Sequence, residues 1–153
     1  MWPGDDRRSR AREIAMQALY QLDIRGSEIL DEIADFIDLS ENDPVCRELA
    51  KKWSLAAWQN VEQCDRIIEK STVKWSLSRL SLVDKSILRL MVYQLIICED
   101  FPPKVVINEA IELAKKYSAD KSPSFINGIL DAIMRKFPEK MQKFKDEKTQ
   151  NKV

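Results

Sequence analysis

The chain contains no histidine. Imidazole is the usual proton-transfer base near neutral pH and a common metal ligand, so its absence argues against both kinds of site. The three cysteines, Cys46, Cys64 and Cys98, are far apart, which favours neither a zinc cluster nor a disulfide framework. We interpret them as small apolar core residues in a reducing cytosol. The sequence therefore predicts no metal and no cofactor.

Glycine is scarce, and long apolar runs are missing. Gly4, Gly26 and Gly128 are the only glycines, so a glycine-rich phosphate-binding loop cannot be assembled. The longest apolar stretch, residues 87–98, is interrupted by two polar side chains and is too short to span a bilayer. The first residues lack the apolar run of a secretory signal. We expect a cytoplasmic protein that does not enter a membrane.

Charge is balanced in total but not in distribution. Lysine plus arginine and aspartate plus glutamate each number 25. Four arginines, Arg7, Arg8, Arg10 and Arg12, stand together without an acid among them, whereas residues 28–43 hold seven acids and no base. A protein that is neutral overall but basic at one place can bind a polyanion locally without adhering to it everywhere.

The apolar pattern indicates helices throughout. Every periodic segment repeats at about 3.6 residues, and none alternates as a strand would. We predict an all-α fold of about seven helices in two packed halves, an N-terminal half at about 6–70 and a C-terminal half at about 72–137, followed by a flexible lysine-rich tail at 138–153. The expected helices span about 6–23, 27–39, 44–70, 81–98, 104–117 and 122–136, with a short helix or turn at 72–80.

The arginine cluster falls at the start of the first predicted helix. A helix N-terminus carries positive partial charge, which disfavours cations there. A phosphate ligand would resolve the conflict, because the arginines and the free backbone amides both attract it. Two interpretations remain open, a solvated basic helix end and a phosphate-binding site. Along the same helix Arg12, Met16 and Tyr20 stack at four-residue spacing, beside the apolar stripe.

A second candidate lies in the first turn of the last helix. Phe125 follows Lys121 closely, and an aromatic side chain beside a lysine can stack on an unpaired RNA base. The alternative is that Phe125 packs into the core. Paired carboxylates at Glu109 and Glu112 are the only enzyme-like feature, and Lys115 and Lys116 are spaced to form ordinary ion pairs with Glu112. We expect no catalysis.

Several of these segments resemble the NusB family of transcription antitermination proteins. Together they run in the family's order from about residue 7 to residue 136. The matching segments are RRSRAREIAMQALY (7–20), ILRLMVYQL (87–95), PPKVVINEAIELAKKY (102–117) and FINGILD (125–131).

The resemblance implies a two-part helical fold that binds the boxA element of nascent single-stranded RNA jointly with the small-subunit ribosomal protein NusE. Such a complex helps RNA polymerase to pass terminators. The RNA site maps by motif to Arg7, Arg8, Arg10, Arg12, Lys121 and Phe125. The NusE contact maps to Tyr20 and Asp84, where a polar tyrosine tip and a carboxylate would face a basic protein.

One departure and two alternatives accompany the resemblance. Gln94 stands where the family usually has glutamate, which puts an ion pair there in doubt, and Glu109 is interpreted as structural. NusB-like domains also occur fused to RNA methyltransferases, so an RNA-modifying enzyme is a second hypothesis. A helical scaffold that binds only protein is a third. Trp58 or Tyr20, if exposed, could equally serve a homodimer that hides the partner surface.

Overall fold

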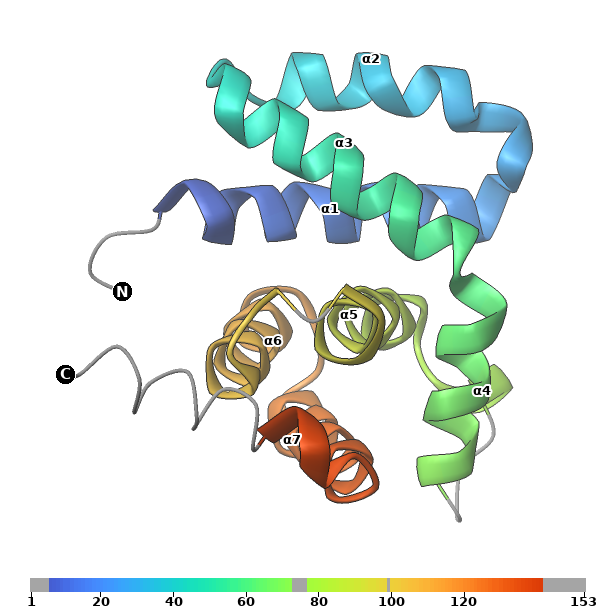
Figure 1. Ribbon diagram of the computed structural model, residues 1–153. Coiled ribbons are helices and arrows are strands. Elements are labelled where there is room, and N and C mark those ends of the chain that lie inside the picture. Colours follow the sequence, from blue (N-terminus) through green and yellow to red (C-terminus); the bar gives the residue numbers. More distant parts are fainter. Residues whose placement is uncertain (1–5, 73–76, 99, 142–153) are drawn as a thin grey trace, which may run out of the picture.

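The computed structural model describes residues 6–72, 77–98 and 100–141, and all regular structure within these residues is helical (Figure 1). The α-helices are α1 (Asp6–Arg25), α2 (Leu30–Ser40), α3 (Pro44–Gln59), α4 (Val61–Ser71), α5 (Leu82–Val92), α6 (Pro103–Tyr117) and α7 (Ser122–Arg135). Between them lie two short 3₁₀ turns, η1 (Ser27–Ile29) and η2 (Leu77–Arg79), and a π-helical segment, η3 (Tyr93–Cys98). The all-α prediction is confirmed.

The helices form two groups joined along one side. α2 and α3 lie along one side of α1, whereas α5 and α6 lie on its other side and are seen end-on, with α7 beyond them (Figure 1). α4 continues from α3 past this second group and contacts α5 and α7. The predicted division after residue 70 therefore falls one helix later than the change in packing.

The predicted single helix over 44–70 is wrong, because it is broken at Asn60. The Asn60 side-chain amide donates to the carbonyl of Ala56 at 2.8 Å, and its backbone has left the α-helical region. A side-chain amide that bonds to a carbonyl four residues earlier competes with the continuing helix. The break turns α4 away from α3, so that Cys64 and Ile68 are buried in the second group.

Three helix ends carry capping or terminating residues that can be recognised in the sequence. The Asp43 carboxylate accepts from the amides of Val45 at 2.9 Å and Cys46 at 3.4 Å and caps α3, with Pro44 in its first turn. The Ser81 hydroxyl accepts from the amide of Asp84 at 3.1 Å and caps α5. Gly26, with φ 78°, adopts the left-handed backbone that ends α1.

The core runs on both sides of α1. Ile14, Ala15, Ala18 and Leu22 are fully buried, and α1 contacts both α3 and α5. Burial raises the pKa of the Cys64 thiol to about 12, so this cysteine behaves as a core residue.

No helix in the described residues is long and apolar enough to cross a membrane. Residues 138–141 form a further helical turn, and the rest of the predicted tail lies outside the described residues.

Candidate nucleic-acid interface

The exposed start of α1 carries two arginines that pair with the loop between α2 and α3. The Arg7 side chain is 64% exposed, and its Nε lies 2.8 Å from the Asp43 carboxylate. Arg10 Nε lies 3.2 Å from Glu41 Oε2, and Arg10 also donates to the carbonyl of Ser40 at 2.9 Å. The acids that pair with the arginine cluster thus come from the acidic stretch at 28–43, about thirty residues away in sequence.

The environment of these acids keeps them ionised. The backbone amide of Asp43 and the guanidinium of Arg10 lower the pKa of Glu41. Partial desolvation raises the pKa of Asp43, but amides of the α3 cap and the charge of Arg7 outweigh it, so the pKa is lowered overall. Glu41 and Asp43 are therefore negatively charged near neutral pH, and they compensate the charges of Arg7 and Arg10.

Arg8 and Arg12 lie on one flank of α1, one helical turn apart, and have different environments. The exposed Arg8 guanidinium lies 5.9 Å from the ring centroid of Phe101. The Arg12 guanidinium lies 4.9 Å from the same centroid, on the interior side. Phe101 is itself buried, so Arg8 lies over the rim of the core and Arg12 within it.

The structure places Arg12, one of the predicted RNA contacts, in the interior, where its side chain is only 2% exposed. Arg12 Nε donates to Gln94 Oε1 at 2.8 Å, and Nη1 lies 3.5 Å from Glu109 Oε1. The Ser9 hydroxyl donates to the same Glu109 oxygen at 2.5 Å. A buried guanidinium requires such partners. Arg12 therefore ties α1 to η3 and α6, Glu109 is structural as expected, and Gln94 serves as an acceptor.

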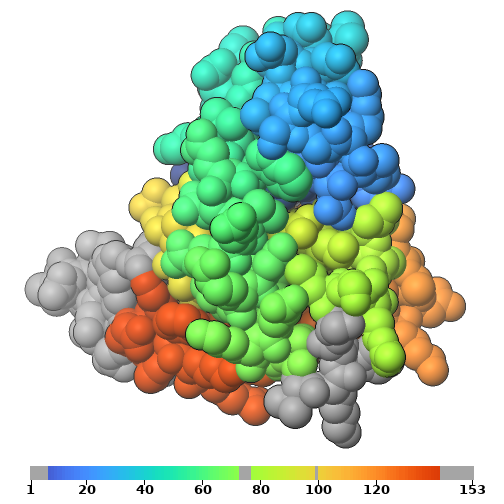
Figure 2. Space-filling view, turned by 90° about the vertical axis from the view of Figure 1, so that its right-hand side faces the viewer, coloured from blue at the N-terminus to red at the C-terminus, as the bar shows by residue number. Residues whose placement is uncertain are grey.

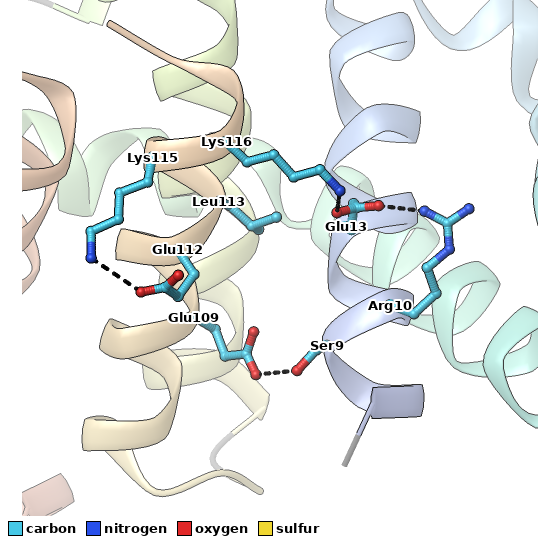
Figure 3. A pocket seen from close by; sticks show the side chains of 8 residues that line it. All are labelled: Ser9, Arg10, Glu13, Glu109, Glu112, Leu113, Lys115 and Lys116. Carbon is cyan, nitrogen blue, oxygen red and sulfur yellow. Dashed lines mark hydrogen bonds and ion pairs between the residues drawn. The ribbon is translucent and has the colours of Figure 1, made fainter. Parts of the chain in front are cut away.

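A groove of about 510 Å³ separates the first half of α1 from α6 (Figure 3). Lys116 reaches across it to Glu13 at 2.7 Å, and Arg10 binds the same carboxylate from the other side (Figure 3). Burial alone would raise the pKa of Glu13, but Lys116 and Arg10 outweigh it and lower the pKa. The groove is lined by Ser9, Arg10, Glu13, Glu109, Glu112, Leu113, Lys115 and Lys116. We name it the α1–α6 groove.

A second groove, of about 630 Å³, lies where η2, the start of α5 and the start of α7 meet. It brings together Lys121 and Phe125, as the sequence predicted. Phe125 is half-buried: it packs against the core, as one of the two interpretations expects, and it also lines the groove. The lining residues are Arg79, Leu80, Ser81, Asp84, Asp120, Lys121, Ser122, Ser124 and Phe125. We name it the Phe125 groove.

Asp84 lines this groove but is not the exposed carboxylate that the resemblance implies. The residue is 7% exposed, and its carboxylate accepts from the hydroxyls of Ser118 and Ser122, the latter at 2.9 Å. These bonds tie the start of α5 to the junction of α6 and α7. Asp84, predicted to contact a basic partner, thus holds this junction through bonds within the chain.

Tyr20 remains accessible on α1. It is half-buried and continues the stripe of Ser9, Glu13 and Gln17, whose members contact α6. Gln17 donates to the hydroxyl of Tyr117 near the last turn of α6, at 3.1 Å. Tyr20 therefore lies one turn beyond that contact.

The α1–α6 groove runs along α6 from Glu109 to Lys116, and the Phe125 groove is lined in part by residues that follow α6 in the chain. Lys116 belongs to the first groove, and Ser118, two residues later, binds the Asp84 carboxylate in the wall of the second. One further cation, Arg79, lies in the Phe125 groove and was missed by sequence reasoning. Its segment is too short to show a periodic pattern, so no signal in the sequence points to it.

The sequence profile of the NusB family matches residues 9–135. The chain belongs to the NusB family. A transcription antitermination protein NusB of Syntrophus aciditrophicus (strain SB) is 44% identical over 130 residues, which cover 85% of this chain and 81% of the relative. The NusB of Clostridium perfringens (strain 13 / Type A) is 44% identical over 133 residues, which cover 84% of this chain and 96% of the relative.

Solved NusB structures agree with this fold. NusB of T. maritima superposes with a TM-score of 0.73 at 36% identity, over 84% of this chain and 90% of that one. A NusB-type chain from a crystal structure of antitermination factors NusB and NusE with double-stranded RNA superposes with a TM-score of 0.75 at 34% identity, over 86% of this chain and 98% of that one. The resemblance noted in the sequence is thereby confirmed.

Proposed function

We propose that this protein is a cytoplasmic transcription antitermination factor that binds single-stranded boxA-type RNA jointly with NusE, within an RNA polymerase complex. It acts by binding and not by catalysis. The relatives that cover most of the chain carry the antitermination name, and a similar chain occurs in a complex with NusE and RNA. The observation that carries the proposal is the presence of exposed arginines at the start of α1 and of Lys121 beside the half-buried ring of Phe125 in the second groove.

The RNA contacts divide between the start of α1 and the Phe125 groove. Arg7, Arg8 and Arg10 bind phosphates at the start of α1, where free helix amides add to the attraction. Lys121 and Phe125 bind a following part of the strand, the lysine through phosphate and the aromatic ring through a base. The end of the α1–α6 groove at Lys116 is close in sequence to Ser118, which binds Asp84 in the wall of the Phe125 groove, and this proximity is compatible with one strand contacting both.

Phosphates must displace Asp43 and Glu41 from two of these arginines. Ion pairs between exposed side chains are worth about 0–1 kcal/mol each, so the exchange costs little. A phosphate oxygen accepts charge-assisted hydrogen bonds as a carboxylate does, and a guanidinium can bind two of its oxygens at once. The acidic loop therefore weakens RNA binding without preventing it.

Tyr20 is the part of the predicted protein-binding surface that stays accessible. A tyrosine offers an apolar ring and a polar tip, which suits a protein interface. Its position beyond the α6 contact leaves room for a NusE-type partner next to the RNA path. Light scattering of the chain alone, before the partner is added, tests whether a homodimer covers this surface instead.

The central test is an anisotropy titration of a labelled boxA-type RNA, with and without the NusE-type protein. Replacing Arg7 and Arg8 by glutamine should weaken binding roughly tenfold and reduce the dependence of log K on log salt by about 0.7 for each phosphate that the protein no longer neutralises. The control is Arg135→Gln, which removes an exposed arginine from the far end of α7. If the double variant and the control bind alike, the arginine assignment is wrong.

A protein-binding scaffold is the second candidate. It is favoured by the ion pairs of Arg7, Arg10 and Arg12, because these pairs compensate positive charges that would otherwise bind RNA phosphates. The same titration separates the two functions. Retention of the NusE-type protein without any affinity for the RNA would select the scaffold.

A further inference from the structure

An apolar cleft of about 220 Å³ lies between α2 and α3. The light-blue surface of α2 adjoins the green surface of α3 in the upper part of the molecule (Figure 2). Leu22 of α1, which is fully buried, lies at the bottom of the cleft, whereas Leu55 of α3 is 45% exposed at its edge. The other apolar lining residues belong to α2, and they are Leu30, Ile33, Ala34 and Ile37. We name this feature the α2–α3 cleft.

The two polar residues that line the cleft have partners within the chain. The Ser54 hydroxyl donates to the carbonyl of Lys51 at 3.3 Å. Lys51 Nζ lies 2.8 Å from Asp38 Oδ1, so the one charged side chain in the lining is compensated. The lining therefore favours an apolar occupant over a polar one.

The size of the cleft suits a single side chain. Its volume is smaller than the roughly 300 Å³ at which sites for small molecules begin. An apolar cavity of roughly 150 Å³ suffices to hold a benzene molecule. One large aliphatic or aromatic side chain of a protein partner therefore fits.

A row of carboxylates borders the cleft along α2. Each of Asp31, Asp35 and Asp38 directly follows a residue that lines the cleft, so the three form a parallel row on the helix. The ion pair of Asp38 with Lys51 connects this row to α3. Asp31 and Asp35 are exposed and form no ion pair with any residue that the structure describes. Two uncompensated negative charges thus stand beside an apolar opening.

The neighbouring surface does not reverse this charge. On α3 the exposed Glu48 and Lys52 are one helical turn apart and offset each other in formal charge. The sequence of α2 contains four acids and no base. Such a surface repels a polyanion and attracts a lysine- or arginine-rich protein segment. Its charge therefore distinguishes it from the arginines at the start of α1.

We propose that the α2–α3 cleft is a docking surface for a lysine- or arginine-rich protein segment that inserts one apolar side chain. That side chain contacts Leu30, Ala34 and Leu55. The cations beside it pair with Asp31 and Asp35. An apolar anchor in a pocket, surrounded by polar contacts, is typical of the residues that dominate the energy of protein binding. The inference does not rest on RNA binding, and it adds a protein-binding surface to the one predicted on α1.

The test is a titration of the isotope-labelled full chain with a short amidated peptide of lysines and alanines that carries one central phenylalanine. Amide NMR resonances of Ala34 and Leu55 should shift, and those of α7 should not. A peptide with alanine in place of the phenylalanine should bind roughly tenfold more weakly, because it lacks the apolar anchor. A peptide with glutamates in place of the lysines should not bind.

A first pair of variants tests the apolar contact. Leu55→Gln should weaken binding of the phenylalanine peptide roughly fivefold. Leu39→Gln is the matched control, because Leu39 is 89% exposed on α2 and does not line the cleft. This control should bind the peptide like the parent chain. Circular dichroism checks that both variants unfold at the temperature of the parent chain.

A second pair tests the charges. Asp31→Asn together with Asp35→Asn should weaken peptide binding about three- to tenfold at low salt and less at high salt. Glu62→Gln together with Glu69→Gln removes two exposed acids of α4 and should leave the affinity unchanged. Equal affinities of the two double variants would contradict the assignment of the acidic row.

Three further outcomes would overturn the proposal. If the alanine and phenylalanine peptides bind equally, the surface attracts cations without docking an apolar side chain. If Leu55→Gln and Leu39→Gln bind the phenylalanine peptide alike, the cleft is not the site. If light scattering shows a dimer of the parent chain that Leu55→Gln dissociates, a second copy covers the cleft. None of these results depends on RNA, so the proposed function stands or fails separately.

Discussion

The start of α1 and the Phe125 groove both carry cations, but these cations are in different electrostatic states. At the start of α1, four neighbouring arginines give the strongest positive signal in the sequence, yet Arg7 and Arg10 pair with an acidic loop and Arg12 is buried. In the Phe125 groove two isolated cations have no ion-pair partner among the described residues. Local charge density in a sequence therefore does not measure the charge that a ligand meets, because folding brings distant acids to the same place.

The largest expected effect concerns stability. Replacing Arg12 by methionine keeps most of the side-chain volume but leaves Glu109 buried without its cation, which should lower the free energy of unfolding by about 3–5 kcal/mol. Urea denaturation followed by circular dichroism measures it. Arg8→Met, one turn earlier and exposed, should change it by less than about 0.5 kcal/mol.

A second variant separates charge loss from packing. Adding Glu109→Gln to Arg12→Met removes the uncompensated carboxylate and should restore part of the stability. If the single and double variants unfold at the same urea concentration, Arg12 stabilises the protein by packing alone, and its ion pair is unimportant.

The next-largest expected effect is on RNA affinity and tests whether a base stacks on Phe125. Phe125→Leu keeps an apolar side chain against the core but removes the stacking surface, so RNA affinity should fall roughly tenfold. Phe137→Leu is the matched control, since Phe137 also packs half-buried against the core but does not line the groove. Equal RNA affinities of the two variants would show that no base stacks on Phe125.

A gain of affinity is expected at the start of α1. Glu41→Gln together with Asp43→Asn removes the negative charges that Arg7 and Arg10 would otherwise exchange for phosphate, and asparagine still caps α3. RNA should bind about three- to tenfold more tightly at low salt, and the gain should shrink as salt rises. The anisotropy titration at two salt concentrations measures both effects, and unchanged affinity at low salt would mean that the loop does not compete with RNA.

The smallest effect is a dependence of stability on pH. The pKa values of Glu41 and Asp43 are lowered in the folded chain by backbone amides and by Arg10 and Arg7. These interactions stabilise the fold above the unfolded pKa values of about 4 and are lost as pH falls further. The parent chain should therefore lose more stability between pH 5 and pH 3 than Glu41→Gln/Asp43→Asn does. Urea midpoints across that range test the difference, which equal slopes would contradict.

Parts of the interface were predictable because they depend on neighbouring residues. The proximity of Arg7, Arg8 and Arg10 follows from one helix, and Lys121 and Phe125 are separated by a single turn. The burial of Arg12 was not predictable from the helix alone, because Phe101 and Glu109 that surround it come from elsewhere in the chain. The internal role of Asp84 likewise depends on serines more than thirty residues away.

The amino-acid pattern alone determined the helical class, the caps at Asp43 and Ser81 and the stop at Gly26, since each depends on interactions within a few residues. Only the tertiary structure decided which cations are compensated by acids, which are buried and which line a groove. The physical reason is that the interaction of a charge depends on distance and solvent exposure, and both are set by segments that meet only when the chain folds.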